Sequence, residues 1–155
     1  MATIHLTKTT TATPEQFLAA LTDFGPGRSE IFGRSADASL RVHDQGPDWA
    51  DVTEGSGGIW ERLRYDWSSP RHIRLTTTDS NTWGGASGHT YTLTPQPDGT
   101  TKIDIVVVRD GKNLKGRLVG GLLGAIGTRI FDREMGKTLA AIEARAGEAS
   151  AGAAG

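Results

Sequence analysis

The chain has 155 residues, a formal net charge of −1 and no cysteine. This length predicts one domain with a sizeable core, and the lack of cysteine excludes disulfides, thiolate metal sites and cysteine nucleophiles. The balanced charge predicts no attraction to nucleic acid. The chain has no apolar run long enough to span a membrane, so we expect no membrane insertion. A cysteine-free chain whose first residues lack a basic region and an apolar run indicates a cytoplasmic protein.

A strand and two short helices are predicted at the start. Residues 3–8 alternate, with Ile4 and Leu6 on one face and polar residues on the other, as in a half-buried strand. Thr13 is a good N-cap, and Gln16 three residues later completes a capping box with Pro14 at the first helical position. Glycines at 25 and 27 end this helix, and residues 29–32 allow only one short further turn.

Six strands are predicted between Ala38 and Arg109, because turn signals divide this segment repeatedly. They form an antiparallel meander in which alternate residues share one face. The apolar residues of the face that we expect to meet the C-terminal helix are Leu40, Val42, Ile59, Leu63, Tyr65, Trp67, Ile73, Leu75, Tyr91, Leu93, Ile103, Ile105 and Val107.

A long helix is predicted from Asn113 to Arg145, and its two halves carry different apolar stripes. Phe131, Met135, Leu139 and Ile142 form the later stripe, whereas the earlier one consists of Leu118, Leu122, Ala125 and Ile126. At 100° per residue the two stripes lie roughly 140° apart, so a straight helix cannot bury both. Because four glycines weaken the first half, we expect a bend or break near Gly124 to Gly127.

The last residues differ in composition from the rest of the chain. Residues 147–155 are Gly, Ala, Ser and one Glu, which predicts disorder. The expected organisation is therefore one domain at residues 1–146 and a disordered Gly/Ala-rich tail at 147–155.

This order of elements resembles the START-like helix-grip superfamily, also called SRPBCC. Residues 12–17 and 21–24 are similar to that family's opening helix, and residues 133–139 are similar to the end of its C-terminal helix. The resemblance implies an α+β fold, a seven-stranded curved antiparallel sheet gripping the long helix. It also implies an apolar cavity between sheet and helix that binds lipids, polyketides or other hydrophobic molecules.

Polar residues also fall on the inner face of the sheet. Glu61 lies between Ile59 and Leu63, where a carboxylate is costly unless it is paired, hydrated or protonated. One interpretation is that Glu61 pairs with Arg109 or a tyrosine and serves only the core. The other is that Glu61 binds a ligand hydroxyl or carbonyl, with His89 or a tyrosine as its counterpart. Because its carboxyl points away from bulk water, burial is expected to raise the pKa of Glu61.

The candidate ligand-binding residues are the inner-face positions of the strands and the first stripe of the helix. They are Glu61, Leu63, Tyr65, Trp67, Leu75, His89, Tyr91, Ile105, Arg109, Leu122 and Ile126. We assign no catalytic residue, no cofactor and no metal site, since the other histidines fall on outer faces without partners at ligand spacing. Trp83 is expected in a loop, where it either gates the cavity or folds back onto the core.

Three functions remain open. The first is binding or transport of a small hydrophobic ligand between sheet and helix. The second is an enzyme of the polyketide cyclase or dehydrase kind that uses Glu61, His89 and a tyrosine, and the third is a toxin-like or chaperone-activator interaction module. A dry apolar cavity would favour the first, hydrogen bonding between Glu61 and His89 the second, and a filled interior the third. The sequence leaves ligand identity and oligomeric state open.

Overall fold

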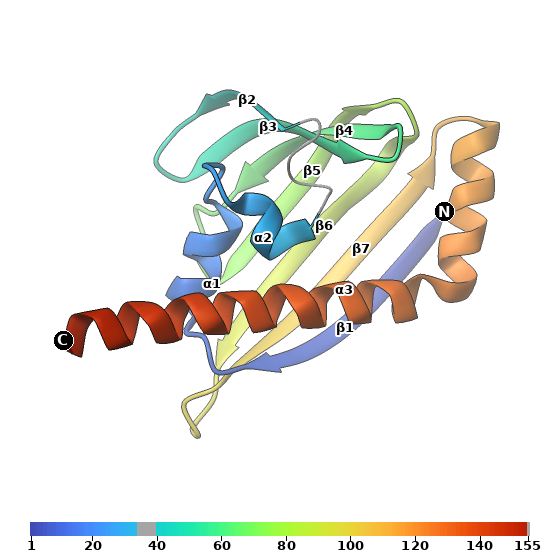
Figure 1. The fold of residues 1–155 in the computed structure, drawn as a ribbon. Coiled ribbons are helices and arrows are strands. Elements are labelled where there is room, and N and C mark those ends of the chain that lie inside the picture. Colours follow the sequence, from blue (N-terminus) through green and yellow to red (C-terminus); the bar gives the residue numbers. More distant parts are fainter. Residues whose placement is uncertain (34–39, 155) are drawn as a thin grey trace.

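The computed structural model describes residues 1–33 and 40–154, so the predicted start of a strand at Ala38 lies outside the described residues. One antiparallel sheet runs in the order β1-β7-β6-β5-β4-β3-β2, and Figure 1 shows it curving around the C-terminal helix. The elements are β1 (Ala2–Thr10), α1 (Pro14–Leu21), α2 (Arg28–Phe32), β2 (Arg41–Gln45), β3 (Trp49–Ser56), β4 (Ile59–Asp66), β5 (His72–Ser80), β6 (Trp83–Pro95), β7 (Thr101–Gly111) and α3 (Leu114–Ala154). The predicted helix-grip fold is confirmed.

The capping box predicted for the first helix is formed. Gln16 N donates to the Thr13 hydroxyl at 3.1 Å, and Thr13 N donates to Gln16 Oε1 at 2.8 Å. Both bonds satisfy backbone donors that a helix start leaves unpaired. They fix α1 so that Phe17 is fully buried in the core against Tyr91, with ring centroids 5.7 Å apart.

The second half of α3 crosses the concave face of the sheet (Figure 1). Leu139 and Ile142 are buried in the main core, and Phe131 and Met135 pack against it. The predicted later stripe therefore faces the sheet. Lys8 of β1 pairs with Asp132 at 3.0 Å and ties the outer edge of the sheet to this helix.

The first half of α3 is bent away from the second, and Figure 1 shows the two parts at a steep angle. The helix remains continuous through the glycines at 124 and 127, as expected for a bend rather than a break. The orientation predicted for the first half is wrong, because Leu118, Leu122 and Ile126 are exposed and the buried positions are Gly116, Gly120 and Gly127.

Close backbone packing explains that orientation. A Cβ atom at Gly116 would lie 2.3 Å from the carbonyl oxygen of Thr82, and one at Gly127 would lie 2.7 Å from Ile4 Cδ1. Only glycine permits such an approach at Gly116. The first half of α3 therefore turns Gly116, Gly120 and Gly127 toward the strands, and Leu118 and Leu122 away from them.

Two further segments differ from the sequence-based expectation. α3 continues as helix to Ala154 where disorder was expected from residue 147, although the side chains of residues 147–152 are exposed. All five residues of β2 are exposed, including Val42, because this strand forms the edge of the sheet beyond β3.

None of the described helices has the length and apolar character needed to cross a membrane.

Candidate functional site

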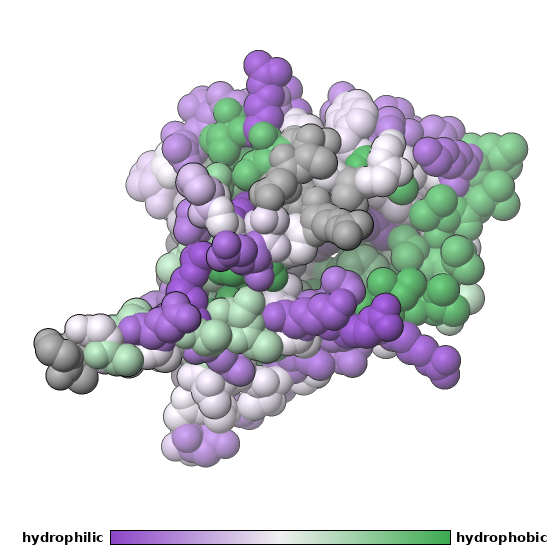
Figure 2. Space-filling view, viewed as in Figure 1, coloured by the Kyte–Doolittle hydropathy of each residue, from purple (hydrophilic) through white to green (hydrophobic). Residues whose placement is uncertain are grey.

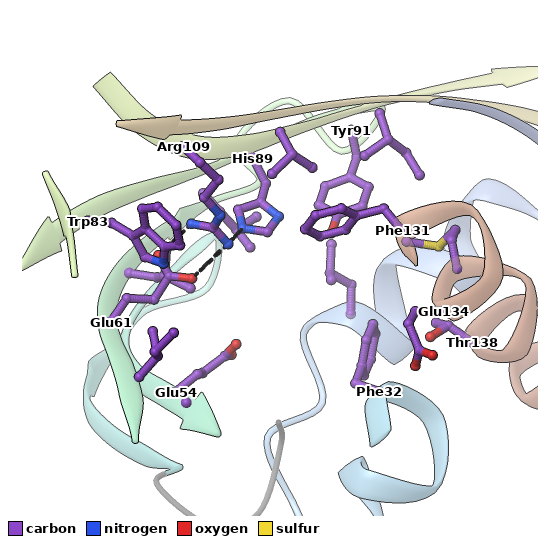
Figure 3. Close-up of a pocket in the computed structure, with 18 of the residues that line it drawn as sticks. Phe32, Glu54, Glu61, Trp83, His89, Tyr91, Arg109, Phe131, Glu134 and Thr138 are labelled. Atoms are coloured by element: carbon purple, nitrogen blue, oxygen red, sulfur yellow. Dashed lines mark hydrogen bonds and ion pairs between the residues drawn. The ribbon is translucent and has the colours of Figure 1, made fainter. Parts of the chain in front are cut away.

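A cavity of about 450 Å³ lies between the sheet and the three helices. Its wall is mostly apolar, and polar side chains enter it from the strands, as Figure 3 shows for Glu54, Glu61, His89 and Arg109. The lining residues are Leu6, Leu21, Arg28, Phe32, Glu54, Gly55, Ile59, Glu61, Leu63, Tyr65, Leu75, Trp83, His89, Tyr91, Ile105, Val107, Arg109, Val119, Leu123, Phe131, Glu134, Met135 and Thr138.

Most of the residues singled out from the sequence lie in this wall. Period-two alternation placed Glu61, Leu63, Tyr65, Leu75, His89, Tyr91, Ile105 and Arg109 on the inner face, and all of these line the cavity. Trp67 does not, because it follows the end of β4 and packs against the outer part of the core. Leu122 and Ile126 point outward, and Val119 and Leu123 of the same helix line the cavity instead.

Glu61 and Arg109 form a buried ion pair. Both guanidinium nitrogens donate to the carboxylate, at 2.9 Å to Oε2 and 3.1 Å to Oε1, and the Thr77 hydroxyl adds a third bond at 3.0 Å. Burial raises the pKa of Glu61, but the attraction of Arg109 and these hydrogen bonds outweigh it, so the pKa lies below its ordinary value. The expectation that burial raises the pKa of Glu61 is therefore wrong, because Glu61 is paired with Arg109.

Arg109 also binds His89, and this contact defines the protonation of the ring. Arg109 Nη2 lies 2.8 Å from His89 Nε2, and a guanidinium only donates, so Nε2 accepts and the neutral ring carries its proton on Nδ1. Burial, with a further contribution from the charge of Arg109, lowers the pKa of His89 to about 4. Figure 3 shows Arg109 lying between Glu61 and His89, which are 3.9 Å apart. His89 and Glu61 are thus joined through Arg109 and not directly.

A second polar cluster, missed from the sequence, consists of Glu54, Tyr65 and Arg28. The Tyr65 hydroxyl donates to Glu54 Oε1 in a short hydrogen bond, and Arg28 Nη2 reaches both the hydroxyl at 3.2 Å and the carboxylate at 3.4 Å. Burial raises the pKa of Glu54 above its ordinary value, because the attraction of Arg28 and the bond from Tyr65 do not offset the loss of water. Burial and the neighbouring Glu54 likewise raise the pKa of Tyr65.

Arg28 is positioned by the end of α1 and by two aromatic rings. Its Nη1 donates to the carbonyls of Leu21 at 3.0 Å and Asp23 at 2.7 Å, which satisfies acceptors that a helix end leaves free. The guanidinium lies 4.7 Å from the ring centroid of Phe24 and 4.5 Å from that of Phe32. Arg28 thus closes one end of the cavity.

Two donors on β6 have no partner among the described residues. They are the Nδ1–H of His89, left over when Nε2 accepts from Arg109, and the hydroxyl of Tyr91. The two rings are nearly parallel, with centroids 6.4 Å apart. Burial raises the pKa of Tyr91 to about 12, so the hydroxyl keeps its proton near neutral pH. A ligand oxygen beside these rings would therefore meet two hydrogen-bond donors.

Aromatic and apolar side chains complete the wall. Trp83 starts β6, is buried, and stacks on Arg109 at 5.2 Å, so it is folded back and does not lie in a long loop. Phe131 closes the opposite side from α3 (Figure 3), and Met135 of the same helix also lines the cavity. Such a space suits a flat or elongated apolar molecule that carries a few polar atoms.

The comparisons with known proteins agree with this geometry. A family model described as polyketide cyclase / dehydrase and lipid transport matches residues 1–147. No curated protein matches the sequence.

Three solved structures illustrate the shared fold. TTHA0849 from Thermus thermophilus has a TM-score of 0.66 at 15% identity, over 96% of this chain and 99% of that chain. The Zhui aromatase/cyclase from Streptomyces has a TM-score of 0.63 at 16% identity, over 93% and 92%. A START superfamily protein from Mycobacterium smegmatis has a TM-score of 0.61 at 12% identity, over 94% and 97%. The chain belongs to the family described as polyketide cyclase / dehydrase and lipid transport, and it shares its fold with the START superfamily protein.

Proposed function

We propose that this protein binds a small, largely apolar molecule that carries a carbonyl or hydroxyl oxygen, in the cavity between the sheet and α3. The observation that carries the proposal is the pair of unpartnered donors, His89 Nδ1–H and the Tyr91 hydroxyl, in an otherwise mostly apolar wall. Both side chains line the cavity, so a ligand oxygen placed beside them could accept a hydrogen bond from each donor. The family's description, which includes lipid transport, supports the same reading.

The structure of the cavity does not favour the interaction module, nor an enzyme in which Glu61 and His89 are hydrogen-bonded to each other. An interior filled by side chains would have favoured an interaction module, and a space of about 450 Å³ is present instead. The enzyme hypothesis relied on a direct bond between Glu61 and His89, and these side chains are 3.9 Å apart with Arg109 between them.

The test compares fluorene with 9-fluorenone, which differ by one carbonyl group. The parent protein is expected to bind the ketone roughly fivefold more tightly, the worth of about one hydrogen bond. Tyr91→Phe keeps the ring and removes a donor, so it should reduce this preference while binding of fluorene is retained. Isothermal titration calorimetry measures both affinities, and native mass spectrometry of freshly purified protein identifies any molecule that co-purifies.

A cavity-filling variant provides the matched control. Met135→Trp adds a ring inside the cavity, whereas Arg133→Trp adds the same ring at an exposed position two residues earlier on α3. Only Met135→Trp should abolish binding of both compounds. Equal loss in the two variants, or no binding by the parent protein, would contradict the proposal.

A second candidate is a cyclase or dehydrase activity, and one observation favours it. Burial raises the pKa of Glu54, so this carboxyl can hold a proton for donation at a higher pH than an ordinary glutamate. In dehydration of a β-hydroxyketone, Glu54 would give its proton to the departing hydroxyl and its carboxylate would take the α proton, releasing water. Turnover that is lost in Glu54→Gln while fluorenone binding persists would establish this activity.

A further inference from the structure

The first half of α3 carries large apolar side chains that face solvent. Leu114, Leu118, Leu122 and Ile126 recur every fourth residue and are 75%, 68%, 60% and 42% exposed. We call these four residues the outer apolar stripe. Figure 2 shows a continuous hydrophobic surface over this part of the molecule, and Figure 1 shows the N-terminus beside it. Met1, at 86% exposure, is also apolar. Contiguous apolar surface of this kind marks an interaction site.

Packing of the other side of the helix imposes this exposure. Gly116 faces the carbonyl of Thr82 and Gly127 faces Ile4, at distances that leave no room for a larger residue at Gly116. Rotation of the helix to bury the leucines would bring side chains against these backbone atoms. The outer apolar stripe is therefore a fixed feature of the fold and remains available to a partner.

Basic side chains accompany the stripe. Lys115, Arg117 and Arg129 are exposed, and the sequence contains no acidic residue between Asp110 and Asp132. At 100° per residue, Lys115 and Arg117 lie on opposite sides of the stripe. Within residues 1–33 and 40–154, none of these three cations pairs with a carboxylate, whereas Lys112 at the helix start is paired with Asp79 at 3.4 Å. The near-neutral net charge of the chain thus conceals a locally cationic, apolar helix face.

We propose that this face docks on the surface of an anionic lipid bilayer. The outer apolar stripe would lie at the boundary between headgroups and acyl chains, and Lys115, Arg117 and Arg129 would lie against lipid phosphates. Long basic side chains suit this arrangement, because their stems lie along apolar surface while their charges reach the headgroups. A second copy of the chain is a poorer occupant, since it would bring the same three cations against each other.

Docking at this face would place the bilayer next to the cavity. Val119 and Leu123 lie on the inner side of the same helical segment and line the cavity, while Leu118 and Leu122 lie on its outer side. One helix thickness thus separates the bound lipid surface from the proposed ligand. The docking inference goes beyond the proposed ligand binding and does not require it, because no residue of the outer apolar stripe lines the cavity.

Vesicle flotation tests the proposal. The parent protein should float with vesicles of phosphatidylcholine and phosphatidylglycerol and should remain behind with phosphatidylcholine alone. The double variant Leu118→Gln/Leu122→Gln should bind anionic vesicles at least about tenfold more weakly, because two buried hydrocarbon side chains are lost. Lys115→Gln/Arg117→Gln should weaken binding roughly fivefold for each charge removed, and added salt should have a similar effect.

Matched controls use exposed residues on other elements. Val42→Gln removes an exposed apolar side chain from β2, and Arg74→Gln removes an exposed charge from β5. Both should bind vesicles like the parent protein, and circular dichroism should show the same melting curve for all variants. Absence of flotation by the parent protein, or equal weakening by the controls, would overturn the proposal.

Sedimentation velocity distinguishes the rival occupant. A parent dimer that Leu118→Gln/Leu122→Gln converts to a monomer would show that a second copy covers the stripe, and this would also overturn lipid docking. Tyr91→Phe should leave flotation unchanged, because the cavity is not part of the docking face. Failure of fluorenone binding and failure of flotation are therefore independent results.

Discussion

Glu54 and Glu61 lie directly opposite each other on β3 and β4, and both line the same cavity. Burial raises both pKa values, but the two close nitrogens of Arg109 outweigh it at Glu61. At Glu54, Arg28 at 3.4 Å and the hydroxyl of Tyr65 do not offset it, so this pKa is raised. Two facing carboxylates in a cavity cannot both ionise at low cost. The closer arginine, with two bonds to Glu61, thus gives the pair one firmly ionised member, and Glu54 holds its proton to higher pH.

The first prediction is that the two glutamates differ in their importance for stability. Glu61→Gln should lower the free energy of unfolding at pH 7 by about 3 to 5 kcal/mol, because it leaves the charge of buried Arg109 without its partner. Glu54→Gln should change it by no more than about 1 kcal/mol, since the amide oxygen still accepts from Tyr65 and Arg28 keeps its bonds to the carbonyls of Leu21 and Asp23. Urea denaturation measures both.

The dependence on pH provides the check. The folded-state pKa of Glu61 lies below 4.5, so its contribution is present above pH 4.5 and is lost as the pH falls through the folded-state value. The deficit of Glu61→Gln relative to the parent protein should therefore narrow below pH 4.5. A deficit that stays constant down to pH 2 would contradict the ion-pair account.

The second prediction concerns His89. Its pKa is about 4 in the folded protein against 6.5 for an ordinary histidine, so the unfolded chain binds more protons between these values. Its contribution is therefore complete above pH 6.5 and is lost as the pH falls toward 4, by about 3 kcal/mol. His89→Gln should flatten the stability profile in this range, whereas His72→Gln, at an exposed position of β5, should not.

The alternation of apolar residues was sufficient to predict the sheet. Side chains two residues apart on a strand share a face, so Ile59, Glu61 and Leu63 could be placed on the inner wall from spacing alone. The turn signals between strands then led to a meander. Alternation also placed Arg109 on this face, but it could not decide between Arg109 and a tyrosine as the partner of Glu61, because Arg109 lies on β7, three strands away in the sheet.

Glu54 and Arg28 were missed for different reasons. Glu54 lies two residues after Val52 and four after Ala50, so alternation places it on the inner face, but the glycines that follow suggested that a turn had already begun. Arg28 lies in a short helix after a glycine-rich segment, where a charged residue usually faces solvent. Its burial depends on the carbonyls at the end of α1 and on two aromatic rings, which only the tertiary fold brings together.

The third prediction separates the two faces of α3. Leu139→Ala should lower the free energy of unfolding by roughly 2 to 5 kcal/mol, because this side chain is buried under the sheet. Leu122→Ala removes the same atoms from an exposed position and should change it by about 0.5 kcal/mol or less. Chemical denaturation of both variants checks the orientation of the helix. Equal losses would mean that the first half of α3 buries its leucines after all.

The last prediction tests why the first half of α3 faces the way it does. Hydrophobicity alone favours burial of Leu118 and Leu122, whereas the structure buries Gly116 against the carbonyl of Thr82. That carbonyl already accepts a hydrogen bond from Lys112 N at 2.9 Å, so it cannot move away without breaking the junction between β7 and α3. Gly116→Ala should therefore destabilise the protein by roughly 1 to 3 kcal/mol.

Gly121 is the matched control, because an added Cβ there meets no atom within 4 Å. Alanine is the better helix former, so Gly121→Ala should stabilise the protein by up to about 1 kcal/mol. Glycine-to-alanine substitution is thus expected to lower stability at Gly116 and to raise it at Gly121, five residues further along the helix. Differential scanning calorimetry would show a melting temperature below that of the parent protein for the first variant and above it for the second. Stabilisation by both variants would mean that the backbone of α3 does not approach Thr82 so closely, and would remove the physical reason for the exposed leucines.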